Sequence, residues 1–222
     1  MSTNRVDPAT LRAAATHGEE MHSGLVTSLS RLDAAHQGLP GGAAGFEYTD
    51  FGKFLDGIQT THQGDRPHVT AIGHSYGSFT LGQAAQREGG IPVDDIILVG
   101  SPGTGADKAA DLGLSPDHVW AGAAESDPIT HLPSKSEVGF GVVGGQFGAG
   151  IAHLADPHEL WFGQDPASAE FGGNRFSVDF GIPPNSHSDY FDEEDGSGGE
   201  SLRNMGRIVS GHPEKVTRQG AR

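Results

Sequence analysis

The hydrophobic positions of this chain change period along its length, and the changes predict alternating strands and helices. Short apolar or alternating runs bounded by turn residues, typical of strands, occur at 68–73, 94–100, 118–124 and 174–180. Apolar and small residues at helical spacing occur at 50–63, 78–87, 106–112 and 201–209. This order indicates an α/β layered domain with a mostly parallel sheet.

The chain before residue 50 follows a different pattern. Asp7-Pro8 is a typical helix start, and apolar or small residues spaced three, four or seven apart follow it. We expect a separate N-terminal helical segment over 1–37 and a Gly- and Pro-rich linker over 38–49. The remaining expected boundaries are 50–211 for the α/β domain and 212–222 for a tail.

Glycine becomes frequent after the third predicted strand. Between 132 and 173, glycines are interleaved with Phe and Val rather than arranged at a helix or strand period. We expect this segment to be a mobile insertion in the α/β domain with an apolar face.

Charge and composition exclude several function classes. The formal net charge is −15, so electrostatics oppose binding to nucleic acid or to anionic membranes. There is no cysteine, and no apolar stretch reaches the roughly 18 residues that a membrane-spanning helix needs. The start of the chain also lacks the basic and apolar regions of a secretion signal. We therefore expect a soluble, cytoplasmic protein.

The stretch from Val69 to Ser78 contains the pattern Gly73-x-Ser75-x-Gly77. Because 35 of the 222 residues are glycine, the bare pattern is a weak signal. Its context is stronger, since an apolar strand enters it and a helix follows, as in a nucleophile elbow. In such an elbow the serine occupies a strained turn, and both glycines are expected to avoid Cβ clashes between strand and helix.

Asp127 and His187 follow predicted strands, as Ser75 does. Sites in parallel sheets form at the carboxyl ends of strands, so the three side chains are expected to lie close together. Their chain order, serine then acid then histidine, is the order that α/β-hydrolases use. Ser75 would be the nucleophile, His187 the general base and acid, and Asp127 the group that orients the histidine. The backbone N–H of Tyr76 would be one oxyanion-hole donor.

Each assignment has a simpler alternative. The alternatives are that Ser75 is a serine in a glycine-rich turn, that Asp127 starts an Asp-Pro turn, and that His187 is a surface histidine, one of twelve histidines in the chain. Asp107, which follows the preceding strand, is the alternative acid.

Other constellations fit known sites poorly. His153 and His158, with Asp156 between them, lack the His-Glu-x-x-His form of a zinc site. The acidic run 189–195 lacks the ligand spacing of a calcium loop. The segment 100–105 lacks the Gly-Lys-Ser/Thr ending of a phosphate loop. No metal and no cofactor is implied.

A series of motifs extends beyond the elbow. They are Asp94-Asp-Ile-Ile-Leu-Val-Gly-Ser-Pro-Gly103, Val119-Trp-Ala-Gly122, Asp127-Pro-Ile129, Phe162-Gly-Gln-Asp-Pro166, Phe171-Gly172, His187-Ser-Asp-Tyr-Phe191 and Ser201-Leu-Arg-Asn204. In this order, over about 50–211, they resemble an actinobacterial α/β-hydrolase family long catalogued as a domain of unknown function. The resemblance implies an esterase-like serine hydrolase and names no substrate. For such an enzyme we expect a small-molecule ester or acyl substrate. The resemblance places Ser75, Asp127 and His187 at the triad positions.

The chain departs from this family before the elbow. In the family fold, several strands and the loop with the second oxyanion donor precede the elbow strand, whereas about 67 mainly helical residues precede it here. We expect the front half of the domain to be missing, leaving an exposed sheet edge that favours homo-oligomers. Two hypotheses follow: a serine esterase, or a truncated, weakly active or inactive relative with a binding or scaffolding role.

The N-terminal helix is loosely similar to helices of small proteins exported by type VII secretion. Tyr190-x-x-x-Glu194 also has the spacing of a short export signature. Type VII-like export is therefore the alternative to a cytoplasmic location.

Overall fold

The computed structural model describes residues 44–131, 159–160, 162–181, 186–192 and 199–220. The chain divides into two compact units, 1–46 and 47–222. The second unit carries the sheet and the candidate site, and the residues described below belong to it, apart from 44–46 at the start of one helix. The helix predicted over 1–37 lies outside the described residues.

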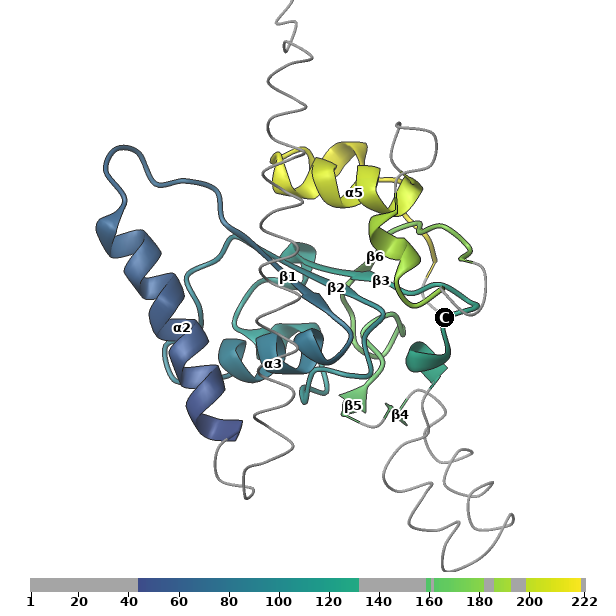
Figure 1. Ribbon diagram of the computed structural model, residues 1–222, viewed down its shortest axis with the longest axis horizontal. Helices are drawn as coiled ribbons and strands as arrows, with labels where there is room; N and C mark the ends of the chain where they lie inside the picture. The colour runs from purple at the N-terminus through teal and green to yellow at the C-terminus, as the bar shows by residue number, and fades with distance from the viewer. Residues whose placement is uncertain (1–43, 132–158, 161, 182–185, 193–198, 221–222) are drawn as a thin grey trace, which may run out of the picture. The chain divides into compact units, whose positions relative to one another are not determined.

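The centre of the second unit is a four-stranded sheet in the order β1-β2-β3-β6 (Figure 1). Every neighbouring pair in this sheet is parallel. The strands are β1 (Thr70–His74), β2 (Asp95–Val99), β3 (Val119–Gly122) and β6 (Asn174–Arg175). The predicted α/β class with a mostly parallel sheet is therefore confirmed, and β1 lies at one edge of the described sheet.

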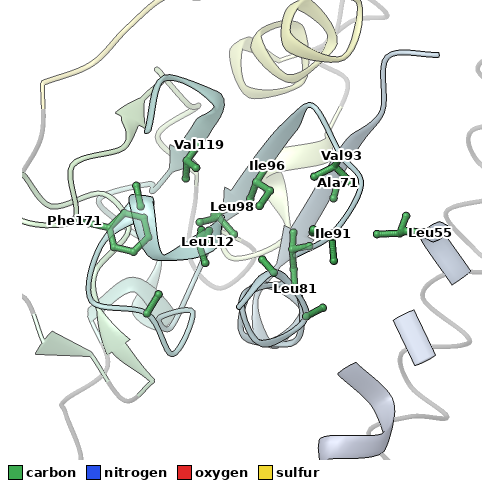
Figure 2. Close-up of a cluster of buried hydrophobic side chains, with 14 residues drawn as sticks. Leu55, Ala71, Leu81, Ile91, Val93, Ile96, Leu98, Leu112, Val119 and Phe171 are labelled. Carbon is green, nitrogen blue, oxygen red and sulfur yellow. The ribbon is translucent and has the colours of Figure 1, made fainter. Parts of the chain in front are cut away.

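Strand β2 is buried on both faces, as a continuous apolar run predicts for an inner parallel strand. One set of alternate side chains packs with Leu81 of helix α3 (Tyr76–Ala85), in the cluster that Figure 2 shows. The other set packs with Ile208 of helix α5 (Glu200–Val209). The sheet is therefore the middle of three layers, with α3 and α5 on opposite faces (Figure 1). The two sets are Ile96 and Leu98 toward α3, and Ile97 and Val99 toward α5.

The other elements are short, apart from one helix. Helix α2 spans Ala44–Thr61 and contributes Leu55 to the cluster around α3. Strands β4 (Glu159–Leu160) and β5 (Gly163–Gln164) form an antiparallel pair. Among the described helices, none combines the length and apolarity needed to cross a membrane. Short 3-10 turns lie at Ala109–Leu112, Pro116–His118, Pro128–His131, Asp189–Phe191 and Pro213–Lys215.

The helices before and after the elbow differ in extent from the prediction. Helix α2 begins at Ala44, inside the segment expected to be a linker to residue 49. Alanine and glutamate are good helix formers, and no proline follows Pro40 before the helix ends. The helix predicted over 106–112 is reduced to one 3-10 turn, which ends at Gly113 with a φ of 75°. That left-handed conformation suits glycine and stops the helix.

The strand predicted over 174–180 is paired with β3 only at its start. From Phe176 the segment also pairs antiparallel with the C-terminal residues, through a bridge between Phe176 and Arg218. Ser177 N–H donates to Thr217 O over 2.8 Å. Phe176 N–H still donates to Ala121 O of β3, so the C-terminal residues pair with the opposite edge of this segment, an arrangement that no local sequence pattern indicates.

The segment expected to be a mobile insertion, 132–173, is packed over its later part. Phe171 is 1% exposed, and Asp165 and Ser168 are buried as well. The Ser168 hydroxyl donates to Asp165 O over 2.7 Å and closes a turn. The expectation of mobility is therefore wrong for 162–173, and the glycine-rich part before it lies outside the described residues.

Candidate active site

Ser75 lies at the turn from β1 into α3 and has an unusual backbone conformation. Its φ is 55° and its ψ is −131°, and among the described residues no other non-glycine residue has a positive φ. Strain of this kind costs about 1–3 kcal/mol and persists only where the surroundings enforce it. Here Ser75 N–H donates to Val99 O over 3.0 Å, and Ser78 N–H donates to Ser75 O over 2.9 Å. Ser75 thus has the strained strand-to-helix position in which a nucleophilic serine is typically found.

The two glycines that flank Ser75 differ in whether a side chain at their position would clash with the turn. A Cβ on Gly73 would lie 2.8 Å from Ser78 Cα and 3.0 Å from Gly77 O, so the turn into α3 needs glycine at this position. A Cβ on Gly77 would meet nothing within 4 Å. The expectation that both glycines prevent a clash is therefore correct for Gly73 and wrong for Gly77.

Asp127 and His187 are in direct contact, although 60 residues separate them in the sequence. Both carboxylate oxygens of Asp127 lie 3.0 Å from His187 Nδ1. An ionised carboxylate only accepts hydrogen bonds, so Nδ1 donates, and in the neutral ring Nε2 is left to accept a proton. The Asp127 side chain is fully buried, whereas that of His187 is 25% exposed. The histidine can therefore reach a substrate while its partner stays shielded from water.

Asp127 keeps its negative charge in spite of its burial. Burial raises the pKa of the carboxyl, but hydrogen bonds from His187, from Tyr190 and from Ile129 N–H lower it, and the net result is a pKa below the ordinary value. The Tyr190 hydroxyl donates to Oδ2 over 2.7 Å, and Ile129 N–H donates to Oδ1 over 2.9 Å. A carboxylate held in this way can orient the imidazole and stabilise its protonated form.

The acid and the histidine lie on two loops that serine hydroxyls join. Ser186, which precedes His187, donates its hydroxyl to Ser126 O over 2.8 Å. Ser126, which precedes Asp127, donates in turn to Gly181 O over 3.1 Å. The contact between the acid and the histidine is therefore supported by the backbone of both loops.

Ser75 approaches this pair through its neighbours. Its N–H donates a hydrogen bond to the carbonyl oxygen of Val99, the last residue of β2. The next residue, Gly100, lies against the Asp127 and His187 side chains. A Cβ on Gly100 would be 2.9 Å from Asp127 Oδ2 and 3.1 Å from His187 Cε1. The ring of His74, which precedes Ser75, lies 4.7 Å from the His187 ring between centroids. The described residues show no hydrogen bond from Ser75 Oγ to His187, a contact that in many enzymes tightens only when substrate binds.

Sequence reasoning missed two residues of this site, Gly100 and Tyr190. Gly100 has a φ of 54°, and its lack of a side chain leaves room for the acid and the histidine. Tyr190 is 2% exposed, and its hydroxyl also accepts the N–H of Ala124 over 3.0 Å. The sequence signals are weak: Gly100 ends a buried strand, and Tyr190 follows His187 by three positions. Tyr190, which the sequence places in an export signature, is buried in the folded domain.

Three aromatic side chains gather beside the elbow. The ring of Tyr76, the residue after Ser75, lies 5.6 Å from that of Phe162 and 5.6 Å from that of Phe79. Phe79 and Phe162 stack at 4.4 Å between centroids. Phe162 fits here because Gly103 lacks a side chain, since a Cβ there would lie 2.5 Å from Phe162 O. Gly103, in the 100–105 loop, therefore makes room for the Phe162 backbone, and the Phe162 ring packs against that of Tyr76, the residue after the candidate nucleophile.

The other sequence alternatives lie elsewhere. Asp107, the alternative acid, is exposed, whereas Asp127 makes the contact with histidine. His153 and His158 lie outside the described residues. Within the part of the chain that the structure describes, no cluster of three or more histidine and carboxylate side chains is arranged to hold a metal ion.

Comparison with known proteins agrees with this architecture. A family described as alpha/beta hydrolase matches residues 31–137, a range that includes Ser75, Asp127 and strands β1 to β3. This chain has an α/β-hydrolase fold. The described parallel sheet and its covering helices make it a reduced form of that fold.

Two mycobacterial relatives carry no functional description. Uncharacterized protein Rv2079 of Mycobacterium tuberculosis is 36% identical over 171 residues, which are 75% of this chain and 25% of that protein. Uncharacterized protein Mb0988c of Mycobacterium bovis is 38% identical over 79 residues, which are 36% of this chain and 29% of that protein. The chain thus spans only about a quarter of the length of these relatives. No solved structure gives a significant match. The resemblance to an actinobacterial hydrolase family of unknown function is confirmed.

Proposed function

We propose that this protein is a serine hydrolase that cleaves carboxylic esters through a covalent acyl-enzyme. Ser75 is the nucleophile, His187 the general base and acid, and Asp127 the carboxylate that orients the histidine. The observation that carries the proposal is the buried Asp127 carboxylate on His187 Nδ1, 3.0 Å away, next to the strained Ser75 turn. The family match supports a hydrolase, and the finer assignment rests on this geometry.

Acylation begins with proton transfer from Ser75 Oγ to His187 Nε2. Oγ forms a bond to the ester carbonyl carbon, and the carbonyl oxygen becomes an oxyanion. The tetrahedral intermediate collapses and breaks the bond to the alcohol oxygen, which takes the proton from His187. Asp127 stabilises the imidazolium during this step, because it remains ionised and bonded to Nδ1.

Deacylation repeats the same steps with water. His187 Nε2 removes a proton from a water molecule, whose oxygen attacks the acyl carbon. The second intermediate releases Ser75 Oγ, which regains a proton from His187, and the carboxylic acid leaves. One ester and one water give one acid and one alcohol, so the cycle balances without a metal or cofactor.

The oxyanion is expected to form at the start of helix α3. The N–H groups of a first helical turn point out of the helix, where they can donate to a negative oxygen. Tyr76 N–H is the first of these groups and follows the nucleophile directly. The positive end of the helix dipole adds to this stabilisation.

The neighbouring side chains favour substrates with an apolar group. Tyr76, Phe79 and Phe162 present half-buried aromatic rings beside the elbow. Apolar or aromatic groups of an ester gain free energy by leaving water at such a surface. We therefore propose a small apolar ester as the substrate class.

Covalent labelling with a fluorophosphonate tests the proposal directly. The wild-type protein should be labelled at one site, and Ser75→Ala should not be labelled, because only an activated serine attacks the probe. Ser78→Ala, which removes a buried hydroxyl one turn away, is the control for a nonspecific loss of labelling. A folded wild-type protein that stays unlabelled would contradict the proposal and support a binding or scaffolding role.

A further inference from the structure

His74 is the last residue of β1 and precedes the candidate nucleophile, yet no step of the proposed reaction uses it. Its Nε2 lies 2.7 Å from the backbone carbonyl oxygen of His187. Its ring faces the His187 ring with centroids 4.7 Å apart and planes inclined by 32°. His74 therefore contacts both the backbone and the imidazole of the candidate base.

The same ring contacts the rest of the segment that carries the base. The Phe191 ring meets it edge-on at 5.5 Å between centroids, and the Tyr190 ring lies at 6.0 Å. Tyr190 in turn donates to Asp127. One side chain of the elbow strand thus touches three aromatic or imidazole rings between residues 187 and 191.

The contact with the His187 carbonyl fixes the proton on His74. A carbonyl oxygen only accepts hydrogen bonds, so His74 Nε2 must donate in either its neutral or its charged form. The bond is therefore directional, and an aromatic ring without an N–H cannot replace it. Because His74 and Ser75 are adjacent in the chain, the strand that presents the nucleophile also holds the backbone of the base.

We propose that His74 is a positioning residue, which holds His187 in register with Ser75 through this hydrogen bond and the ring contact; the role rests on the proposed hydrolase function. Asp127 fixes the rotation of the His187 ring through Nδ1, but it does not fix the distance between the histidine backbone and the elbow. His74 supplies that second constraint. A base displaced by about 1 Å can lower the reaction rate on the order of 100-fold.

Two substitutions separate the hydrogen bond from the ring. His74→Phe keeps an aromatic ring and removes the donor, whereas His74→Gln keeps an N–H donor of similar reach. With a short p-nitrophenyl ester, His74→Phe should lower kcat about 10- to 100-fold and leave KM unchanged, because His74 contacts the base and not the substrate. His74→Gln should recover part of kcat. A wild-type kcat in folded His74→Phe would overturn the proposal.

His62→Phe is the matched control. His62 Nε2 also lies within hydrogen-bond distance of a backbone carbonyl, that of Asp65 at 2.9 Å, but the contact is exposed and follows helix α2. This variant should keep the wild-type kcat and KM. If His62→Phe lowers kcat as much as His74→Phe does, the effect is not specific to positioning and the proposal is overturned.

A spectroscopic measurement makes the test independent of turnover. The proton between His187 Nδ1 and Asp127 should give a downfield proton NMR resonance, assigned by its loss in Asp127→Asn. The resonance should be sharp in wild type and His62→Phe, broadened in His74→Phe and sharper again in His74→Gln. An unchanged resonance in His74→Phe would overturn the positioning role. If the fluorophosphonate fails to label wild type, the hydrolase proposal fails, and this measurement still decides whether His74 positions His187.

Should His74→Phe fail to fold by circular dichroism, His74→Gln and His74→Asn replace it. The glutamine amide reaches the position of Nε2, whereas the shorter asparagine amide does not. A higher kcat and a sharper downfield resonance for the glutamine variant support the proposal. Equal values for the two variants overturn it.

Discussion

The Tyr190 hydroxyl donates to Asp127 Oδ2 over 2.7 Å and accepts the N–H of Ala124 over 3.0 Å. It thereby links the acid of the candidate site to the chain just beyond strand β3. The hydroxyl is buried, so no water can take its place without a change in packing. Asp127 is consequently held from three sides, by a tyrosine, a backbone amide and a histidine.

Tyr190→Phe should reduce both activity and stability. The substitution removes one hydrogen bond to a charged carboxylate and leaves the buried Ala124 N–H without its acceptor, at a cost of about 1–3 kcal/mol. We expect kcat/KM for a short ester to fall on the order of 10-fold, because the carboxylate is less firmly held. Urea denaturation and steady-state kinetics measure the two effects.

Ser201→Ala is the matched control for Tyr190→Phe. Ser201 Oγ also donates to a carboxylate, Asp179 Oδ2 at 2.9 Å, and accepts a backbone N–H, that of Asp179 at 2.8 Å, but it lies at the start of α5. This variant should lose stability without losing kcat/KM. If Tyr190→Phe loses no more activity than Ser201→Ala, the tyrosine has only a structural role.

Asp127→Asn should lower turnover much more strongly than it lowers stability. The amide cannot stabilise an imidazolium and favours the wrong tautomer of His187, a change that can cost roughly 10⁴-fold in kcat. Asp107→Asn, at the exposed alternative acid, should leave kcat unchanged. Hydrolysis of a p-nitrophenyl ester by both folded variants decides the assignment, and it would be wrong if Asp107→Asn were the slower enzyme.

Much of this arrangement could be predicted from the sequence because it depends on local patterns. The apolar run of β2 predicts a strand buried on both faces, and chain order alone places Ser75, Asp127 and His187 beyond strand ends. The roles of His74 and Tyr190 could not be predicted in this way. Their partners lie more than 60 positions away, and neither residue belongs to a pattern that reports a contact across that distance.

Glycine content is a poor guide to structure at two places in this chain. It suggested mobility over 162–173, where burial of Phe171 and a hydrogen-bonded turn order the chain. The Gly73-x-Ser75-x-Gly77 pattern also predicts that both glycines avoid a Cβ clash, although only Gly73 faces backbone atoms of α3. Composition records how many glycines are present, whereas their role depends on neighbours that are set by the tertiary fold.

Gly73→Ala and Gly77→Ala should therefore behave differently. Alanine at 73 would place its Cβ 2.8 Å from Ser78 Cα, so we expect a large loss of folded protein or of fluorophosphonate labelling. Alanine at 77 has open space in the first turn of α3, and the better helix former should change stability by less than about 1 kcal/mol. Thermal melts and labelling of both variants test this, and equal damage at the two positions would contradict the geometry.

Gly100→Ala should separate crowding of the site from backbone strain. Its φ is 54°, and its Cβ would lie 2.9 Å from Asp127 Oδ2 and 3.1 Å from His187 Cε1. Gly172→Ala has a similar φ of 78° but meets nothing within 4 Å. Both variants should lose about 1 kcal/mol or more from strain, but only Gly100→Ala should also lose kcat, on the order of 100-fold, because the histidine is displaced. Equal kcat in the two variants would argue against a catalytic role for the histidine at this position.

Asp179 provides a pH-dependent contribution to stability outside the candidate site. Its carboxylate accepts Glu200 N–H, Ser201 N–H and the Ser201 hydroxyl, each at about 3 Å, and so caps helix α5. Burial raises the pKa of this carboxyl, but the hydrogen bonds outweigh it and hold the pKa below the ordinary value of 3.8. A carboxyl whose pKa is lower in the folded state stabilises the fold fully above the unfolded value and loses that effect as the pH falls through the folded value.

Asp179→Ala should therefore cost about 0.5–2 kcal/mol at pH 7, the usual range for a lost helix cap. The difference from wild type should stay constant down to about pH 4 and shrink below it, because protonation removes the same interaction from the wild-type protein. Urea denaturation of both proteins between pH 7 and pH 3 measures the difference. Asp117→Ala, at an exposed carboxyl of the turn before β3, should show no comparable change. A difference that grows as the pH falls would mean that the carboxyl is not held as an anion by the start of α5.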